Sequence, residues 1–544
     1  MRLTRRTRLA GVALIAAASL TLAACGGGSD SEGGGGDGGS TDAVITSFSV
    51  QPQNPLVPTN TNEVGGGNIV DLIFAGLISY KVDGSSENEV AESITSEDNK
   101  LWTVKLKPGW KFSDGSDVTA SSFVDAWNYG ADPANKQLSA YFFYPIAGTD
   151  DEGSALDGAK TISGLKVVDD TTFTIELKQP ESDFPGRLGY SAFFPLPEAA
   201  FDDIEAFGKK PIGNGPYNFE SMQDNVEAVL VPSETYEGVR PAKNGGVTLK
   251  FYENPDAAFS DVQAGNLDVL DQVPPSALTT YEDDSSIQAF SEPGSPNSTI
   301  TIPESLPGFE KGEEGNLRRQ AISKAINREE ITDKIFDGSR IPSTDFSSPL
   351  MPGFTEDIPG QDVLDFDAAG AKDLWAQADA IKPFEGDFVI SYNSDGPGNK
   401  EWVEALANQL KNNLDIDAKP KAFPTFAELR TEVTDRTIGT AFRTGWQPDY
   451  PSIYNYLAPI FGTGAGSNDG DYSNKEFDGL LNQASGAQDD DERYKLLADA
   501  QAILFKDLPA IPLWNTSISA AAADGVENVE FNWQNKPELQ NITK

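Results

Sequence analysis

Histidine is missing from all 544 residues, and cysteine occurs only at position 25. Without histidine, the chain cannot build histidine-based catalytic triads, histidine general bases or imidazole metal sites. A single cysteine excludes disulfides within the chain, so stability has to come from large packed cores. Basic residues are also scarce, with 41 Lys and Arg against 84 Asp and Glu and a net charge of −43. This charge repels nucleic acid and anionic lipid, and we expect no nucleic-acid partner.

The lone cysteine follows a typical export signal. Four arginines precede an apolar stretch from 9 to 22, which is too short for a comfortable membrane span. The segment Leu22-Ala23-Ala24-Cys25-Gly26 resembles the lipobox of bacterial lipoproteins. That resemblance implies cleavage before Cys25 and a diacylglyceryl group on its sulfur, and two acyl chains anchor a protein stably. We therefore expect an extracytoplasmic protein held at the cell membrane through Cys25. The alternative is an ordinary secretory signal with a chance cysteine.

Residues 25–42 are almost wholly Gly, Ser, Asp and Glu, a composition that cannot bury apolar surface and behaves as a flexible tether. The remaining 500 or so residues exceed what one hydrophobic core usually holds, which predicts two or three lobes.

Periodic patterns identify elements in the first half of this body. Leu101–Lys107 alternates apolar and polar residues, which predicts a strand with one buried face. Thr119 can cap a helix whose Phe123 and Trp127 face inward. A second alternating segment, Thr172–Lys178, predicts another strand, and together these elements indicate a small α+β lobe.

The second half alternates strands with helices. Asn327, followed by Glu330, predicts a helix start. Phe388–Tyr392 has the pattern of a strand, and Trp402–Leu414 and Asp489–Phe505 have the pattern of helices. Strands and helices that alternate in this way predict α/β layers around central sheets.

Seven segments, in this order and spacing, resemble family 5 of the extracytoplasmic solute-binding proteins of ABC importers, which includes the oligopeptide- and dipeptide-binding proteins. At Asn214 the family commonly has threonine, a departure that looks tolerable. The segments are Asp71–Leu77, Leu106–Ala120, Gly213–Tyr217, Gln263–Asp268, Arg319–Arg328, Asp449–Pro451 and Pro509–Leu513.

The resemblance implies an α/β fold of the class II periplasmic-binding-protein type, with two hinged lobes and a small α+β subdomain inserted in the first. Ligand would bind between the lobes, and hinge closure would bury it. It further implies a monomeric protein without a cofactor or enzymatic activity, which captures peptides and delivers them to ABC permease and ATPase subunits. The expected boundaries are lobe I at 43–70, 190–297 and 512–544, the inserted subdomain at 71–189, and lobe II at 298–511.

The same resemblance places the peptide site in the segment from Arg443 to Asp449. Family members grip the peptide as an added strand, so that main-chain hydrogen bonds supply affinity. By position, Asp449 would accept the peptide ammonium, and the backbone of Gly445–Gln447, with Gln447 at its end, would pair with the peptide. Arg443 would meet the carboxylate through its planar fork, and Trp446 would line a side-chain pocket. The alternatives are that Asp449 is a turn carboxylate, that Arg443 is a solvated or lobe-bridging cation, and that Trp446 belongs to the core.

The opposing wall is expected at Asn62, Glu63 and Val64, where Glu63 would add a second acid near the ammonium. The glycine run at 65–67 gives the alternative of a flexible loop there.

Other functions stay open from the residues alone. The ligand could be an oligosaccharide, a metal chelate or haem, since 8 Trp, 15 Tyr and 30 Phe supply many aromatic faces. A carboxylate-dependent hydrolase is the alternative from another class, but no paired acids identify one. The segment Asn468–Asp471 has carboxylates without the remaining features of an EF-hand, so it predicts calcium only weakly.

Overall fold

The computed structural model of the chain describes residues 42–150, 152–394 and 398–544. The predicted signal segment and Cys25 lie outside this range, as does the tether apart from Asp42. Within it, no helix is both long enough and apolar enough to cross a membrane.

The main sheet has eleven strands among the described residues, in the order β15-β14-β16-β12-β17-β11-β1-β10-β9-β8, with β13 paired to β17. Its two long central strands, β12 and β17, run antiparallel from Ile287 opposite Ala523 to Thr301 opposite Ala510. The lobe boundaries predicted after residues 297 and 511 fall inside β12 and β17. The bounds are β1 Val44–Ser49, β8 Tyr217–Gln223, β9 Glu227–Pro232, β10 Gly246–Phe251, β11 Val269–Leu270, β12 Ile287–Thr301, β13 Arg340–Pro342, β14 Phe388–Asn393, β15 Ala418–Phe423, β16 Ala441–Trp446 and β17 Ala510–Ala523.

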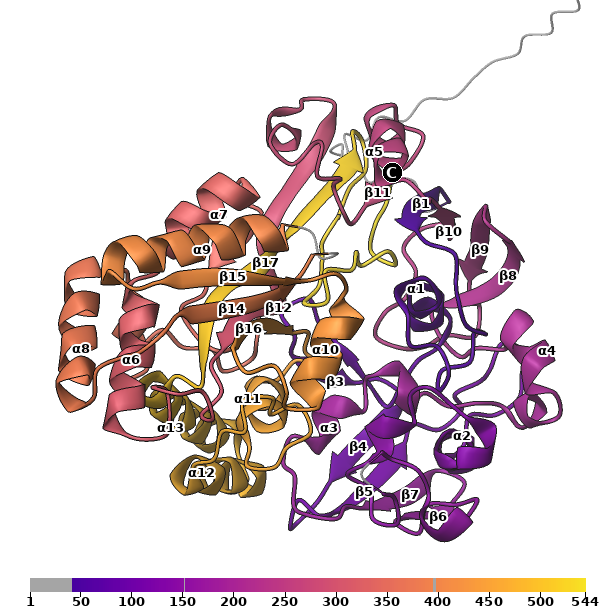
Figure 1. Ribbon diagram of the computed structural model, residues 1–544. Coiled ribbons are helices and arrows are strands. Elements are labelled where there is room, and N and C mark those ends of the chain that lie inside the picture. Colours follow the sequence, from indigo (N-terminus) through magenta and orange to yellow (C-terminus); the bar gives the residue numbers. More distant parts are fainter. Residues whose placement is uncertain (1–41, 151, 395–397) are drawn as a thin grey trace, which may run out of the picture. The chain divides into compact units, whose positions relative to one another are not determined.

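A smaller antiparallel sheet has the order β4-β5-β7-β6, drawn in purple in Figure 1. Strands β5 (Leu101–Leu106) and β7 (Thr172–Glu176) confirm the two alternating segments, and Trp102 and Val104 of β5 are buried. Thr119 begins helix α2 (Ala120–Ala131) through a capping box with Ser122. The other strands of this sheet are β4 Ala91–Thr95 and β6 Leu165–Asp169, and β2 Ile78–Tyr80 and β3 Ser86–Asn88 form a separate two-stranded sheet.

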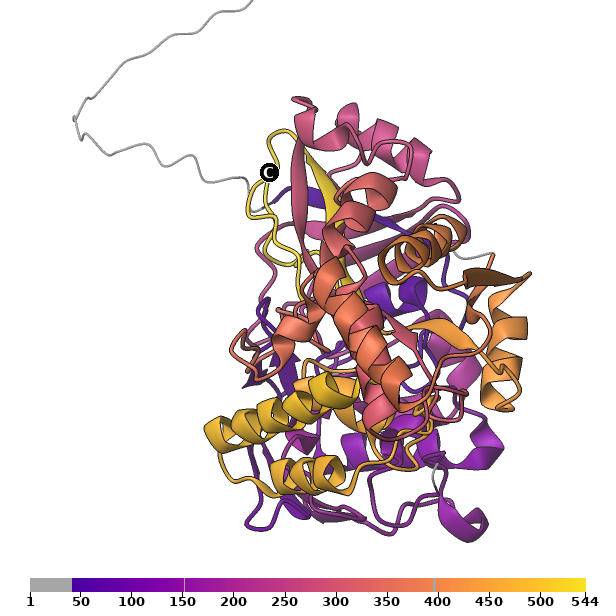
Figure 2. The same ribbon diagram turned by 60° about the vertical axis from the view of Figure 1, so that its left-hand side comes forward.

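Helices accompany the β14–β15–β16 end of the main sheet. Helix α9 packs on β14 and β15, and α8 packs on α6 and α9 (Figure 1). Helices α12 and α13 lie side by side (Figure 2). Asn327 caps α7 as predicted, because its side chain accepts from the Glu330 backbone N–H. The helices of this half are α6 Glu313–Lys324, α7 Arg328–Phe336, α8 Ala368–Ile381, α9 Asn399–Leu414, α10 Phe426–Thr434, α11 Ile453–Phe461, α12 Lys475–Gly486 and α13 Asp490–Asp507.

The buried apolar side chains form several clusters. One large cluster has its members between 45 and 281 and between 518 and 542. A second cluster has members between 300 and 514, and a third has members between 346 and 533. Most buried apolar residues after 517 thus pack with the N-terminal half of the chain. The domain boundaries themselves stay a prediction.

The short helices of the first half are α1 Val64–Ile73, α3 Phe184–Arg187, α4 Ile204–Lys209 and α5 Pro255–Gln263.

Candidate functional site

Strand β16 has one edge that is only partly paired. On one side it pairs with β12 as far as Trp446, which lies opposite Asn297. On the other side it pairs with β14 only at Ala441 and Phe442. From Thr444 to Trp446, this second edge has no strand partner within the described part of the chain. Unpaired backbone groups of this kind can accept an additional strand.

Two cavities flank the end of β16, and Gln447 lines both of them. One, of about 460 Å³, is lined by Arg443, Gly445 and Trp446, and we call it the basic cavity. The other, of about 440 Å³, is lined by Asp449, and we call it the acidic cavity. Six residue steps of extended chain span at most about 20 Å, so one short segment places an acid and a guanidinium in neighbouring cavities.

The charges that line the two cavities differ in sign. The acidic cavity has six carboxylates and two cations, namely Glu63, Asp71, Glu89, Asp271, Asp449 and Glu538 against Arg240 and Lys536. The basic cavity has three arginines and one carboxylate, namely Arg340, Arg430 and Arg443 against Asp469. A solute with a positive end and a negative end would therefore match both cavities.

Asp449 is half-buried and has no ion-pair partner within 4.0 Å among the described residues. Burial raises the pKa of its carboxyl, while a hydrogen bond from Asn455 and the charge of Arg187 act in the opposite direction. Arg187 itself is held by Glu181, with 2.6 Å between Nε and Oε1. The Asp449 carboxylate is therefore positioned by the protein but not neutralised by a bonded cation.

The residue that positions Asp449 is Asn455 of α11, which is 3% exposed. Its Oδ1 accepts from the Asp449 backbone N–H at 3.0 Å and from Trp446 Nε1 at 2.9 Å. Its Nδ2 donates to Asp449 Oδ2 at 3.2 Å. One buried amide thus links the acid to the tryptophan. The sequence analysis missed Asn455 because no motif singles it out.

Arg443 lies in β16 and donates from Nη1 to Asn393 Oδ1 at 3.1 Å. Its guanidinium also lies 5.9 Å from the centre of the Phe426 ring, a cation–π arrangement. These contacts hold the side chain on the wall of the basic cavity. Trp446 lines the same cavity and also packs against an apolar cluster, so it is both a core residue and a wall residue. The roles of Arg443 and Trp446 toward a ligand stay predictions.

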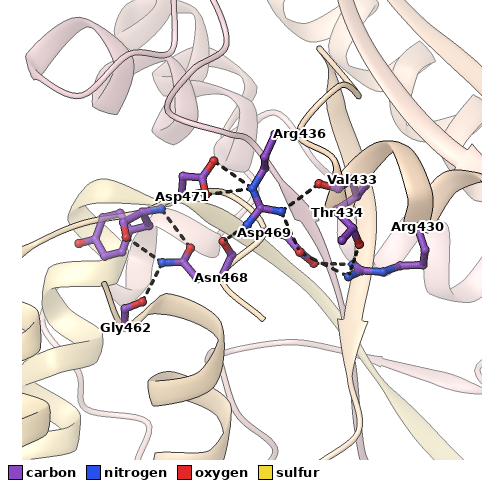
Figure 3. Close-up of polar contacts among 9 residues, drawn as sticks. Arg430, Val433, Thr434, Arg436, Gly462, Asn468, Asp469 and Asp471 are labelled. Carbon is purple, nitrogen blue, oxygen red and sulfur yellow. Dashed lines mark hydrogen bonds and ion pairs between the residues drawn. The ribbon is translucent and has the colours of Figure 1, made fainter. Parts of the chain in front are cut away.

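The rim of the basic cavity is fixed by an ion-pair network between the segment 430–436, which covers the end of α10 and the residues after it, and the segment 468–471 (Figure 3). Arg430 contacts Asp469 at 2.5 Å, and Arg436 contacts Asp471 at 3.0 Å. Arg436 also pairs with Asp469 at 3.4 Å. The carboxylates weighed as a calcium site thus pair with arginines, and the described residues contain no cluster of three or more His, Cys, Asp or Glu side chains arranged to hold a metal ion.

Asn62, Glu63 and Val64 all line the acidic cavity. The glycine run after them forms the first turn of α1 rather than a loop, which corrects that alternative. Glu63 is the N-cap of this helix, and its carboxylate accepts from the backbone N–H groups of Gly66 and Gln53, each at 3.1 Å. A carboxylate at a helix N-terminus is favoured by the helix dipole. Any contact of these residues with a ligand stays a prediction.

Comparison with known proteins agrees with this architecture. The chain is 24% identical over 487 residues to the oligopeptide-binding protein OppA of Bacillus subtilis, covering 84% of this chain and 85% of that protein. It is 27% identical over 464 residues to the periplasmic murein peptide-binding protein MppA of Escherichia coli, covering 82% of each chain. The solved structure of MppA, a periplasmic murein tripeptide binding protein, in its unliganded open form superposes with a TM-score of 0.81, at 23% identity, over 92% of this chain and 97% of that one.

These similarities confirm the expected fold, the two-lobed periplasmic-binding-protein type. Residues 86–468 match the profile of the bacterial extracellular solute-binding proteins, family 5. Since the match covers well over half of the chain, this protein belongs to the bacterial extracellular solute-binding proteins of family 5.

Proposed function

We propose that this protein is the substrate-binding component of an ABC importer, and that it captures peptides and delivers them to a membrane permease. The observation that carries the proposal is the segment from Arg443 to Asp449. It has a guanidinium in the basic cavity, a carboxylate in the acidic cavity and, at Thr444–Trp446, a strand edge without a strand partner among the described residues.

A free peptide has matching chemistry at each of these three places. Its ammonium would be held by Asp449, its backbone would add to β16 beyond Arg443, and its carboxylate would be held by the Arg443 side chain. A peptide of three or four residues spans roughly 10 to 14 Å, less than the reach of the segment itself. Main-chain pairing would bind peptides of many sequences, while the two charges would select their ends.

Calorimetry with blocked peptides tests the proposal. Trialanine and tetraalanine are compared in free, N-acetylated and C-amidated forms. Acetylation removes the ammonium and leaves a carboxylate buried without a partner, so we expect a loss of about 3–5 kcal/mol in binding free energy. Equal binding of free and acetylated peptides would contradict the assignment of Asp449.

In this proposal the protein binds its solute and does not transform it, and it needs no cofactor. Incubation of the purified protein with the same peptides, followed by mass spectrometry, should return them intact. Hydrolysis that persists through purification and requires a folded protein would favour the hydrolase alternative.

We also propose that the mature protein is a monomer tethered to the outer face of the cell membrane through lipid on Cys25. The lipobox-like segment and the Gly/Ser-rich stretch after it support this proposal. A Cys25→Ser variant should partition into the aqueous phase on detergent extraction, whereas the wild type should follow the detergent. Identical partitioning of both proteins would contradict the lipid anchor.

A further inference from the structure

A second carboxylate in the acidic cavity, that of Asp271, is only partly satisfied by the protein. Asp271 directly follows β11, which lies between β1 and β17 in the main sheet. It lines the cavity, yet its Oδ1 atom is buried and has no hydrogen-bond partner among the described residues. An ionised carboxylate with an unsatisfied buried oxygen is unfavourable unless a partner arrives.

The remaining acids of the cavity, apart from Asp449, already have partners. Asp71 pairs with Lys536 at 2.6 Å, and Glu89 pairs with Arg240 at 3.0 Å. Glu63 caps α1, and Glu538 accepts hydrogen bonds from Asn532 and Gln540. Asp449 accepts a hydrogen bond from Asn455. Asp271 is therefore the cavity carboxylate that has a buried oxygen without a hydrogen-bond partner among the described residues.

We propose that Asp271 forms a subsite for a second positive charge on the solute, the side-chain ammonium or guanidinium of a lysine or arginine in the bound peptide. This inference rests on the proposed function. Asp449 would then hold the α-ammonium, and Asp271 would select peptides that carry a basic residue at one position.

The electrostatics of Asp271 support this assignment. Burial raises the pKa of its carboxyl to about 7, although a hydrogen bond from its own backbone and the charge of Lys536 lower it in part. The carboxyl is thus only partly ionised in the empty cavity at neutral pH. A bound cation favours the ionised form, so binding of a basic peptide should release a proton from Asp271.

The test is a lysine scan by calorimetry. Trialanine and tetraalanine are measured with lysine at each position in turn, and each peptide is compared with its norleucine counterpart, which keeps the alkyl chain without the charge. In the wild type we expect one position at which lysine binds at least tenfold more tightly than norleucine. In Asp271→Asn this ratio should fall to about one, with norleucine peptides bound as in the wild type.

Glu538→Gln is the matched control, because it removes a negative charge from the same cavity at a carboxylate that already accepts hydrogen bonds. It should keep the lysine preference. Repeating the wild-type titrations in buffers of different ionisation enthalpy gives an independent readout, and lysine but not norleucine should release protons near pH 7.

These measurements distinguish a failure of the proposed function from a failure of the Asp271 subsite alone. If no peptide binds the wild type, the proposed function falls, and this inference falls with it. If peptides bind without a lysine preference, or if the preference persists in Asp271→Asn, the inference alone is overturned. Equal loss of the preference in Glu538→Gln, or absence of proton release, would also overturn it.

Discussion

The two cavities beside β16 are both lined by Gln447, but their charged side chains differ in how they are bonded within the protein. In the basic cavity, Arg430 is paired with Asp469, and Arg443 is held by Asn393 and the Phe426 ring. In the acidic cavity, Asp71 and Glu89 form ion pairs. Glu63, Asp449 and Glu538 accept hydrogen bonds, whereas a buried oxygen of Asp271 has no hydrogen-bond partner among the described residues.

The difference suggests where binding energy is concentrated. A cation that enters the acidic cavity relieves an existing electrostatic penalty, whereas an anion in the basic cavity adds to contacts already made. We therefore expect the ammonium end of the ligand to contribute more selectivity than the carboxylate end. The predictions below test this asymmetry, from the largest expected effect to the smallest.

Asp449→Asn should weaken the binding of trialanine by about 3–5 kcal/mol, because the ligand ammonium would be buried opposite an uncharged amide. Thermal unfolding of the empty protein should hardly change, since the carboxylate has no ion-pair partner in the described structure to lose. Calorimetry and melting curves measure the two effects. Unchanged affinity for trialanine would contradict the proposal that the acidic cavity binds the peptide ammonium.

Asn455→Ala should reduce both binding and stability. It removes three hydrogen bonds and leaves the Trp446 Nε1–H without its partner, which we expect to destabilise the empty protein by about 2 kcal/mol. Denaturant titration checks this value. The exposed Asn266→Ala is the control and should change stability by less than about 0.5 kcal/mol. Equal effects of both variants would contradict the role of Asn455.

Arg443→Lys should weaken binding of free trialanine by about tenfold, because lysine keeps the charge but lacks the planar fork. C-amidated trialanine should bind the wild type and the variant alike, since it has no carboxylate to meet. Calorimetry with the two peptides separates these cases. A loss as large as that of Asp449→Asn would reverse the proposed asymmetry between the cavities.

The empty protein should become less stable as pH rises from 4 toward 7, in part because of Asp271. Its pKa is raised to about 7 in the folded state, so the folded protein holds a proton that the unfolded chain releases near pH 4. The slope from one such group is at most about 1.4 kcal/mol per pH unit. Asp271→Asn should flatten the curve of unfolding free energy against pH, and an unchanged curve would contradict the raised pKa.

Local rules predicted much of the fold. The alternation in Leu101–Lys107 and the capping by Thr119 and Asn327 depend on neighbours within a few residues, and the structure confirms all three. The order of the family segments also predicted the fold type, because those segments recur together in one architecture.

The rest of the site depends on contacts between distant segments. The glycines at the start of α1 looked like a loop, but a Cβ at Gly65 would lie 2.4 Å from the Val50 carbonyl oxygen, so close packing requires glycine within the helix. Asp271 is buried only because β1 and β17, far away in sequence, flank β11. Asn455 acts through Trp446 and Asp449, which no helical pattern reveals.

The most direct measurement is a crystal structure of the protein with bound trialanine. The account predicts that the peptide nitrogen at the N-terminus lies within hydrogen-bonding distance of the Asp449 carboxylate. It also predicts that the peptide backbone pairs with β16 beyond Arg443 and that the C-terminal carboxylate points toward the Arg443 guanidinium. A peptide in the reverse direction, or one bound outside both cavities, would contradict the account.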